Sequence, residues 1–147
     1  PIDSIITGQI AAQMPGLKEN VHQTFKEMRE TGSSSGYNPM LESLFRPSVQ
    51  PFILSWMEYN PQEEIAKLEM PVLLINGTKD LQVNQSEAEK LEEAYPAAEL
   101  LILDKMNHVF RKIEGDQLEN SKSYNEPMLP LHPELVPGIV SFIENLK

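Results

Sequence analysis

Two short runs of apolar residues, at positions 72–75 and 100–103, constrain the fold of this chain more than any other feature. Neither run alternates with polar residues, a pattern typical of strands that are buried on both faces in a parallel sheet. Between the runs, Asn84 is placed to cap a helix, and Pro96 ends that helix. Two parallel strands joined by a helix form a right-handed βαβ unit. The sequence therefore predicts an α/β fold with a parallel sheet.

The two parts of the chain differ in pattern. Residues 1–69 carry helical periodicity only, whereas residues 70–147 alternate strand and helix. We therefore expect a helical region over 1–69 and an α/β region over 70–147. In the second region, the pattern predicts a polar loop over residues 113–132 and a last helix that begins at Pro133.

The composition excludes several classes of function. The formal net charge of −10 argues against nucleic acid and against an anionic membrane surface as partners. No cysteine is present, which excludes disulfides, thiolate metal sites and a cysteine nucleophile. No metal-ligand spacing and no glycine-rich phosphate loop occur, so the sequence predicts no metal and no cofactor. No apolar run reaches the ~18 residues of an integral membrane segment, and nothing in the sequence assigns a cellular compartment.

Asp80 follows the first predicted strand, and His108 follows the second. The carboxyl ends of parallel strands meet at one edge of the sheet, where open α/β folds bind their ligands. There, an aspartate can accept a hydrogen bond from one imidazole nitrogen and leave the other free to take a proton from a nucleophile. Taken singly, Asp80 is better explained as a turn residue after Gly77, and His108 as an ordinary loop histidine. Their matching positions at two strand ends favour a catalytic pair.

Residues 68–110 resemble the C-terminal part of the α/β-hydrolase superfamily. The resemblance is carried by Leu68-x-x-Pro71-Val-Leu-Leu-Ile-Asn-Gly77-Thr-Lys-Asp80 and by Met106-Asn107-His108-Val109-Phe110. A wider span is similar to one bacterial group, the serine-aminopeptidase-like or lysophospholipase-like hydrolases, through Phe45-Arg-Pro-Ser48, Gln50-Pro-Phe52, Ser55-Trp56 and Leu129-Pro-Leu131.

This resemblance implies the C-terminal half of an α/β-hydrolase fold. Residues 1–69 would be a helical cap, and residues 70–147 a portion of the hydrolase core. Asp80 would be the acid of a catalytic triad and His108 its base, in the chain order that the family uses after its serine. The substrate would be a small-molecule ester or amide.

The family's oxyanion loop and nucleophile turn have no counterpart in this sequence. The segment Gly32-Ser-Ser-Ser-Gly36 matches G-x-S-x-G in letters, with Ser34 in the central place. That motif needs a strand directly before it and a helix directly after it, whereas here a helical pattern precedes it and Tyr37-Asn38-Pro39 follows. We therefore expect a flexible loop at Ser34 and a portion of a serine hydrolase that is inactive alone. A complete small enzyme that uses Ser34 is a third alternative.

Three apolar residues of the helical region, Phe52, Trp56 and Met57, could line an acyl pocket, although packing of a cap against the sheet explains them equally well. The alternative to a hydrolase portion is a non-catalytic α/β interaction module in which Asp80 and His108 are loop residues. An uncovered sheet edge and an apolar patch would favour self-association, so we expect a homo-oligomer.

Overall fold

The computed structural model describes residues 2–146 and divides into two compact units, Pro1–Pro61 and Gln62–Lys147. The division expected from the sequence lies later, between residues 69 and 70. The short helix α5 (Pro61–Ile65) accounts for the difference, because the side chain of Gln62 donates to the carbonyl of Lys90 in the second unit (3.4 Å). The fold is mixed α/β, as the sequence predicts, with a two-stranded parallel sheet.

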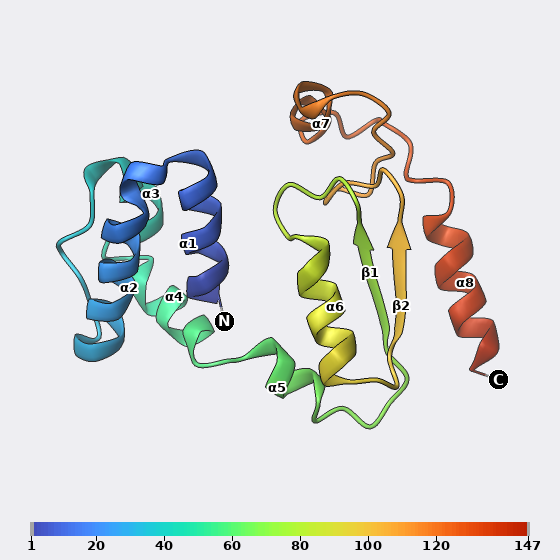
Figure 1. The fold of residues 1–147 in the computed structure, drawn as a ribbon, viewed down its shortest axis with the longest axis horizontal. Coiled ribbons are helices and arrows are strands. Elements are labelled where there is room, and N and C mark those ends of the chain that lie inside the picture. Colours follow the sequence, from blue (N-terminus) through green and yellow to red (C-terminus); the bar gives the residue numbers. More distant parts are fainter. Residues whose placement is uncertain (1, 147) are drawn as a thin grey trace. The chain divides into compact units, whose positions relative to one another are not determined.

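The first unit consists of helices α1 (Ile2–Gln13), α2 (Lys18–Thr31), α3 (Glu42–Phe45) and α4 (Gln50–Met57), with single 3-10 turns at Pro15–Leu17 and Pro39–Leu41 (Figure 1). Gly32 ends α2 in a left-handed conformation (φ 83°), and its N–H donates to the carbonyl of Met28 (2.9 Å). The rings of Phe25 and Phe45 meet edge to face, with centroids 5.0 Å apart. One apolar cluster forms the core of this unit: Val21, Phe25, Met28, Leu41, Phe45, Ile53 and Met57.

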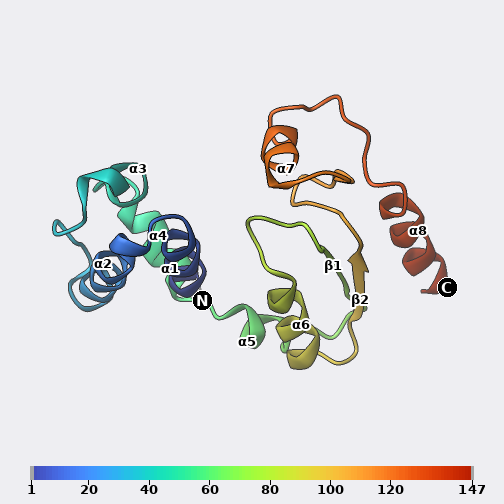
Figure 2. The same cartoon turned by 45° about the horizontal axis from the view of Figure 1, so that its top comes forward.

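The second unit is built on strands β1 (Leu73–Gly77) and β2 (Glu99–Leu103), which pair in parallel with Ile75 opposite Leu101. Helix α6 (Gln85–Ala94) connects them, and α8 (Leu135–Asn145) lies on the other side of the sheet (Figures 1 and 2). Asn84 caps α6 as expected, accepting a hydrogen bond from the N–H of Ser86 (3.0 Å). The βαβ arrangement predicted from the two apolar runs is confirmed.

Helix α8 covers the sheet face that carries Ile75, Leu101 and Leu103. Leu135 and Ile139 supply the apolar contacts from the helix. A side chain at Gly138 would collide with Leu101, so the helix lies close to the strand because this position has none.

The polar loop predicted over residues 113–132 is wrong in part, because it contains helix α7 (Gln117–Ser123). Asp116 caps this helix, and its Oδ1 accepts hydrogen bonds from the N–H groups of Leu118 and Glu119 (3.0 Å each). Asp116 followed by Glu119 has the spacing of a capping box. The periodicity argument missed the helix because Leu118 is its only apolar residue, and that side chain is 62% exposed.

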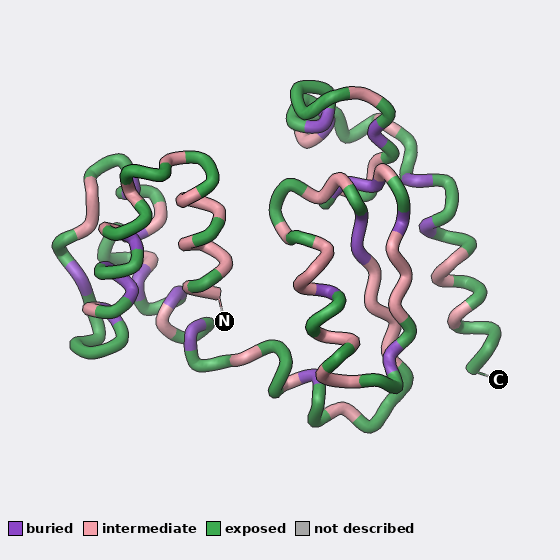
Figure 3. Tube along the Cα trace, in the orientation of Figure 1, coloured by how far each residue is buried: buried purple, intermediate pink, exposed green. Residues whose placement is uncertain are grey.

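Burial in the second unit is concentrated at the carboxyl ends of the strands (Figure 3). Residues 73–75 of β1 are only half-buried, and no third strand pairs with β1 or β2 within residues 2–146. On α8, the side chains of Val136, Val140 and Ile143 form a stripe that is 45–53% exposed. None of the helices within residues 2–146 is both long and apolar enough to cross a membrane.

Two methionines of the helical unit make a matched test of its core. Met28 is fully buried, and Met40 is 71% exposed. We expect Met28→Ala to lower the free energy of unfolding by about 2–5 kcal/mol, through lost burial and the cavity left behind. Met40→Ala should change it by less than about 0.5 kcal/mol. Urea unfolding followed by the fluorescence of Trp56, the only tryptophan, measures both; equal losses would contradict the placement of this core.

Candidate acid–base site

Asp80 lies in a tight turn that follows β1. Its N–H donates to the carbonyl of Gly77 (3.1 Å), and its Oδ1 accepts hydrogen bonds from the N–H groups of Gln82 (2.7 Å) and Val83 (2.8 Å). The turn role considered for Asp80 is therefore real. It uses only one carboxylate oxygen, and the other, Oδ2, lies 2.9 Å from Nδ1 of His108.

His108 lies in a short hairpin that follows β2. Met106 and Lys112 form an antiparallel bridge, and the N–H of Asn107 donates to the carbonyl of Arg111 (3.0 Å). Phe110 completes the turn with a positive φ of 61°. This hairpin fixes the backbone on both sides of the imidazole, so the sheet brings together the two residues that the sequence singles out.

The two partners differ in exposure. The Asp80 side chain is 6% exposed, and that of His108 is 41% exposed. An ionised carboxylate has no proton to give, so the shared proton is assigned to Nδ1 of His108. The lone pair then lies on Nε2, which has no hydrogen-bond partner within residues 2–146. Both residues line a cavity of about 360 Å³, together with Asn76, Met106 and Phe110.

The loops that carry the pair are in direct backbone contact. The N–H of Thr78 donates to the carbonyl of Leu103 (3.2 Å), and the N–H of Lys79 to that of Met106 (3.0 Å). A side chain at Gly77 would overlap the backbone carbonyl of Met106, so this approach requires glycine. The separation of Asp80 and His108 is therefore set by contacts at the strand ends.

A buried amide network joins helix α7 to both loops. The side chain of Asn107, 1% exposed, donates to Oδ1 of Asn120 (3.0 Å) and to the hydroxyl of Ser123 (2.7 Å), and accepts from the N–H of Arg111 (2.9 Å). Asn120 in turn donates to the carbonyl of Lys79 (2.7 Å). Asn107 belongs to the motif on which the resemblance rests, but its role in the network could not be foreseen, because α7 was not predicted.

Ionisable groups near the pair have displaced pKa values. Hydrogen bonds from Lys105 and Lys112, at the base of the His108 hairpin, lower the pKa of Glu114 to about 2. Burial raises the pKa of Tyr124 above its usual range, and the nearby charge of Asp80 adds to this shift. The backbone N–H groups of Leu81 and His108 oppose the shift of Tyr124 without reaching ordinary hydrogen-bond geometry.

Ser34 is part of a buried contact within the helical unit. Its hydroxyl donates to the carboxylate of Glu27 (2.6 Å), and its backbone N–H and carbonyl both bond to the side chain of Gln50 (2.8 and 2.7 Å). No hydrogen bond joins Ser34 to a histidine within residues 2–146. The loop expected to be flexible is thus held by buried hydrogen bonds, and Ser34 has no histidine beside it of the kind that serves as base for a triad serine.

The three residues considered for an acyl pocket lie on helix α4. Met57 is buried in the core of the helical unit. Phe52 and Trp56 are exposed, and their rings meet in a tilted arrangement with centroids 4.6 Å apart. Their assignment to substrate binding stays a prediction.

His132 lies just before α8, and its Nδ1 accepts a hydrogen bond from the N–H of Glu134 (3.3 Å). Its Nε2 lies 3.0 Å from the carbonyl oxygen of Asp104, so both ring nitrogens have partners.

Comparison with known proteins assigns no family to this chain. No protein-family model matches the chain, and no curated protein matches it. Within residues 2–146, no group of three or more His, Asp or Glu side chains is placed to hold a metal ion.

The asparagine network offers a test of how the site is held. We expect Asn107→Ala to lower the free energy of unfolding of the second unit by roughly 1–3 kcal/mol, because the buried partners lose their hydrogen bonds. Asn125→Ala, at an exposed position beyond α7, should have little effect. Amide hydrogen exchange of residues 105–113 should accelerate in the first variant only. Unchanged protection there would show that the hairpin does not depend on the network.

Proposed function

We propose that this chain supplies the acid and the base of a serine-hydrolase site that transfers acyl groups. The observation that carries the proposal is the 2.9 Å contact between Oδ2 of Asp80 and Nδ1 of His108, with the aspartate buried and the imidazole open. A general base needs this combination: one ring nitrogen held by a carboxylate, and the other facing the space where substrate and nucleophile meet.

In the proposed reaction, a serine hydroxyl attacks the carbonyl carbon of a small ester or amide, and Nε2 of His108 takes the hydroxyl proton. The Asp80 carboxylate stabilises the imidazolium that results. His108 then returns the proton to the departing alcohol or amine as the acyl–oxygen or acyl–nitrogen bond breaks. In the second half of the reaction, His108 takes a proton from a water molecule, which attacks the acyl–serine ester. The acyl group leaves as a carboxylic acid, and the proton returns to the serine oxygen.

The proposed reaction needs a serine hydroxyl next to Nε2 of His108, and no serine within residues 2–146 forms a hydrogen bond with that nitrogen. We therefore propose that the chain corresponds to the C-terminal portion of an α/β-hydrolase, with the helical unit as its cap. By itself, the chain should show no serine-dependent turnover of p-nitrophenyl esters, and Ser34→Ala should change nothing.

A non-catalytic interaction module is the second candidate. It is favoured by the two backbone hydrogen bonds that give Asp80 a complete structural role in its turn. The exposed stripe on α8 fits this function as well. In that case, the contact with His108 would only hold two loops together.

The state of the His108 ring tests the base assignment, because a general base needs its proton on Nδ1 and an accessible Nε2. At a pH where the His108 ring is neutral, nitrogen-15 NMR should show the proton on Nδ1. The free Nε2 should react readily with diethyl pyrocarbonate. Asp80→Asn should favour the proton on Nε2, because an amide N–H can donate to Nδ1, and should slow the reaction.

His132 is an internal reference for this experiment, since both of its ring nitrogens are bonded. Asp104→Asn is a matched control that removes a carboxylate from the same edge of the sheet without touching His108. If the wild-type proton lies on Nε2, or if Asp80→Asn and Asp104→Asn react alike, the base assignment fails.

We further propose that the chain self-associates through the stripe of Val136, Val140 and Ile143 on α8. Burial of three aliphatic side chains across a two-fold axis would remove an apolar surface from water. Val140→Asp should shift the protein toward monomer in sedimentation at micromolar concentration, and Ser141→Asp, one position along the same exposed helix, should not. A wild-type protein that is already a uniform monomer would rule out this association.

A further inference from the structure

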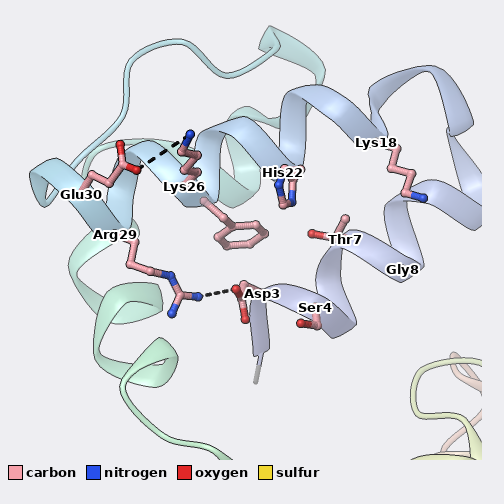
Figure 4. A pocket seen from close by; sticks show the side chains of 10 residues that line it. Asp3, Ser4, Thr7, Gly8, Lys18, His22, Lys26, Arg29 and Glu30 are labelled. Atoms are coloured by element: carbon pink, nitrogen blue, oxygen red, sulfur yellow. Dashed lines mark hydrogen bonds and ion pairs between the residues drawn. The ribbon is translucent and has the colours of Figure 1, made fainter.

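The helical unit contains a groove of about 510 Å³ between α1 and α2 (Figure 4). Basic side chains of α2 line one wall, and Ser4, Thr7 and Gly8 of α1 line the other. The ring of Phe25, which belongs to the core and is only 3% exposed, lies at the floor of the groove. This volume falls within the range of small-molecule sites, and the groove takes no part in the acid–base function proposed above.

The charges of the groove are only partly balanced. Arg29 forms an ion pair with Asp3, and Lys26 lies 4.0 Å from Glu30. The side chain of Lys18 has neither an ion pair nor a hydrogen bond to any of residues 2–146, and the same holds for the side chain of His22. The two lie four positions apart on α2, so both project to one side of that helix.

One hydroxyl group, that of Thr7, faces these basic side chains, and Ser4 lies beside Asp3 at the other end of the groove. Ser4 and Thr7 are one turn apart on α1, and neither side chain makes a hydrogen bond within residues 2–146. Figure 4 shows Thr7 and His22 directed into the same space. Gly8 adds no side chain, and a Cβ there would meet nothing within 4 Å, so the groove stays open beside them.

The cluster is unusual in so acidic a chain. Residues 1–61 contain four Lys or Arg residues, and three of them line the groove: Lys18, Lys26 and Arg29. The remaining one, Arg46, bonds instead to Ser48 and to the carbonyl of Ser43. In a protein with a net charge of −10, an anion is attracted only where basic groups gather in this way.

We propose that this groove binds the phosphate monoester of a small organic molecule. Lys18, His22 and the Thr7 hydroxyl offer three donors, which suits a group with three oxygens and a charge near −2 better than a carboxylate with two oxygens. The organic part of the ligand would lie along Phe25 and over Gly8. Asp3 and Glu30 neutralise Arg29 and Lys26, so the phosphate is placed at the Lys18 end.

Isothermal titration of the full chain with phenyl phosphate tests the proposal. We expect saturable binding by the wild type that weakens at least about tenfold in Lys18→Ala, because one charge-assisted hydrogen bond is lost. Thr7→Val, which keeps the shape of the side chain, should also weaken binding. Arg46→Ala removes the same charge from outside the groove and should bind like the wild type.

Benzoate and inorganic phosphate complete the experiment. Both should bind more weakly than phenyl phosphate, since benzoate lacks the third oxygen and inorganic phosphate lacks the apolar part. Four results would overturn the proposal: no saturation by phenyl phosphate at millimolar concentration, an equal loss in Arg46→Ala and Lys18→Ala, binding unaffected by Thr7→Val, or equal binding of either comparison anion. Circular dichroism of each variant confirms that helix content is retained.

Discussion

The close contact between the two loops that follow β1 and β2 determines the arrangement of the second unit. Gly77 allows the backbone of Met106 to approach, and hydrogen bonds from Thr78 and Lys79 fix the distance between the loops. Two strands alone are marginal as a sheet. Here the most buried residues lie where the loops meet, so the rigid part of the unit is also the part that carries Asp80 and His108.

Asp80 combines two duties that are often treated as alternatives. One carboxylate oxygen shapes the turn, and the other faces the imidazole. A carboxylate fixed in this way by backbone N–H groups would need no reorganisation to stabilise the charge on His108 that the proposed reaction requires. The same feature explains why a turn residue and a triad acid look alike in a sequence: both can follow a strand, and Asp suits both.

Much of the fold could be predicted from the sequence, and the limits have physical causes. The apolar runs at 72–75 and 100–103 gave the parallel pair, and the strand ends indicated that Asp80 and His108 meet. Helix α7 was not predicted, because it is attached by Asn120 and Ser123 and not by an apolar face, so no hydrophobic periodicity marks it. The hydrogen bonds by which Gln50 holds the Ser34 loop were not predicted for a related reason. A buried side-chain amide that holds a loop has no sequence pattern of its own.

The polar attachment of α7 has a thermodynamic consequence. Its one apolar side chain, Leu118, already faces water, and its contacts with the loops are amide and hydroxyl hydrogen bonds. Heat-capacity changes follow the exposure of apolar surface. Detachment of α7 would therefore change the heat capacity of the protein only slightly, and calorimetry would register it through the enthalpy of the broken hydrogen bonds. The cover over the carboxyl edge of the sheet can in this way open without the sheet itself melting.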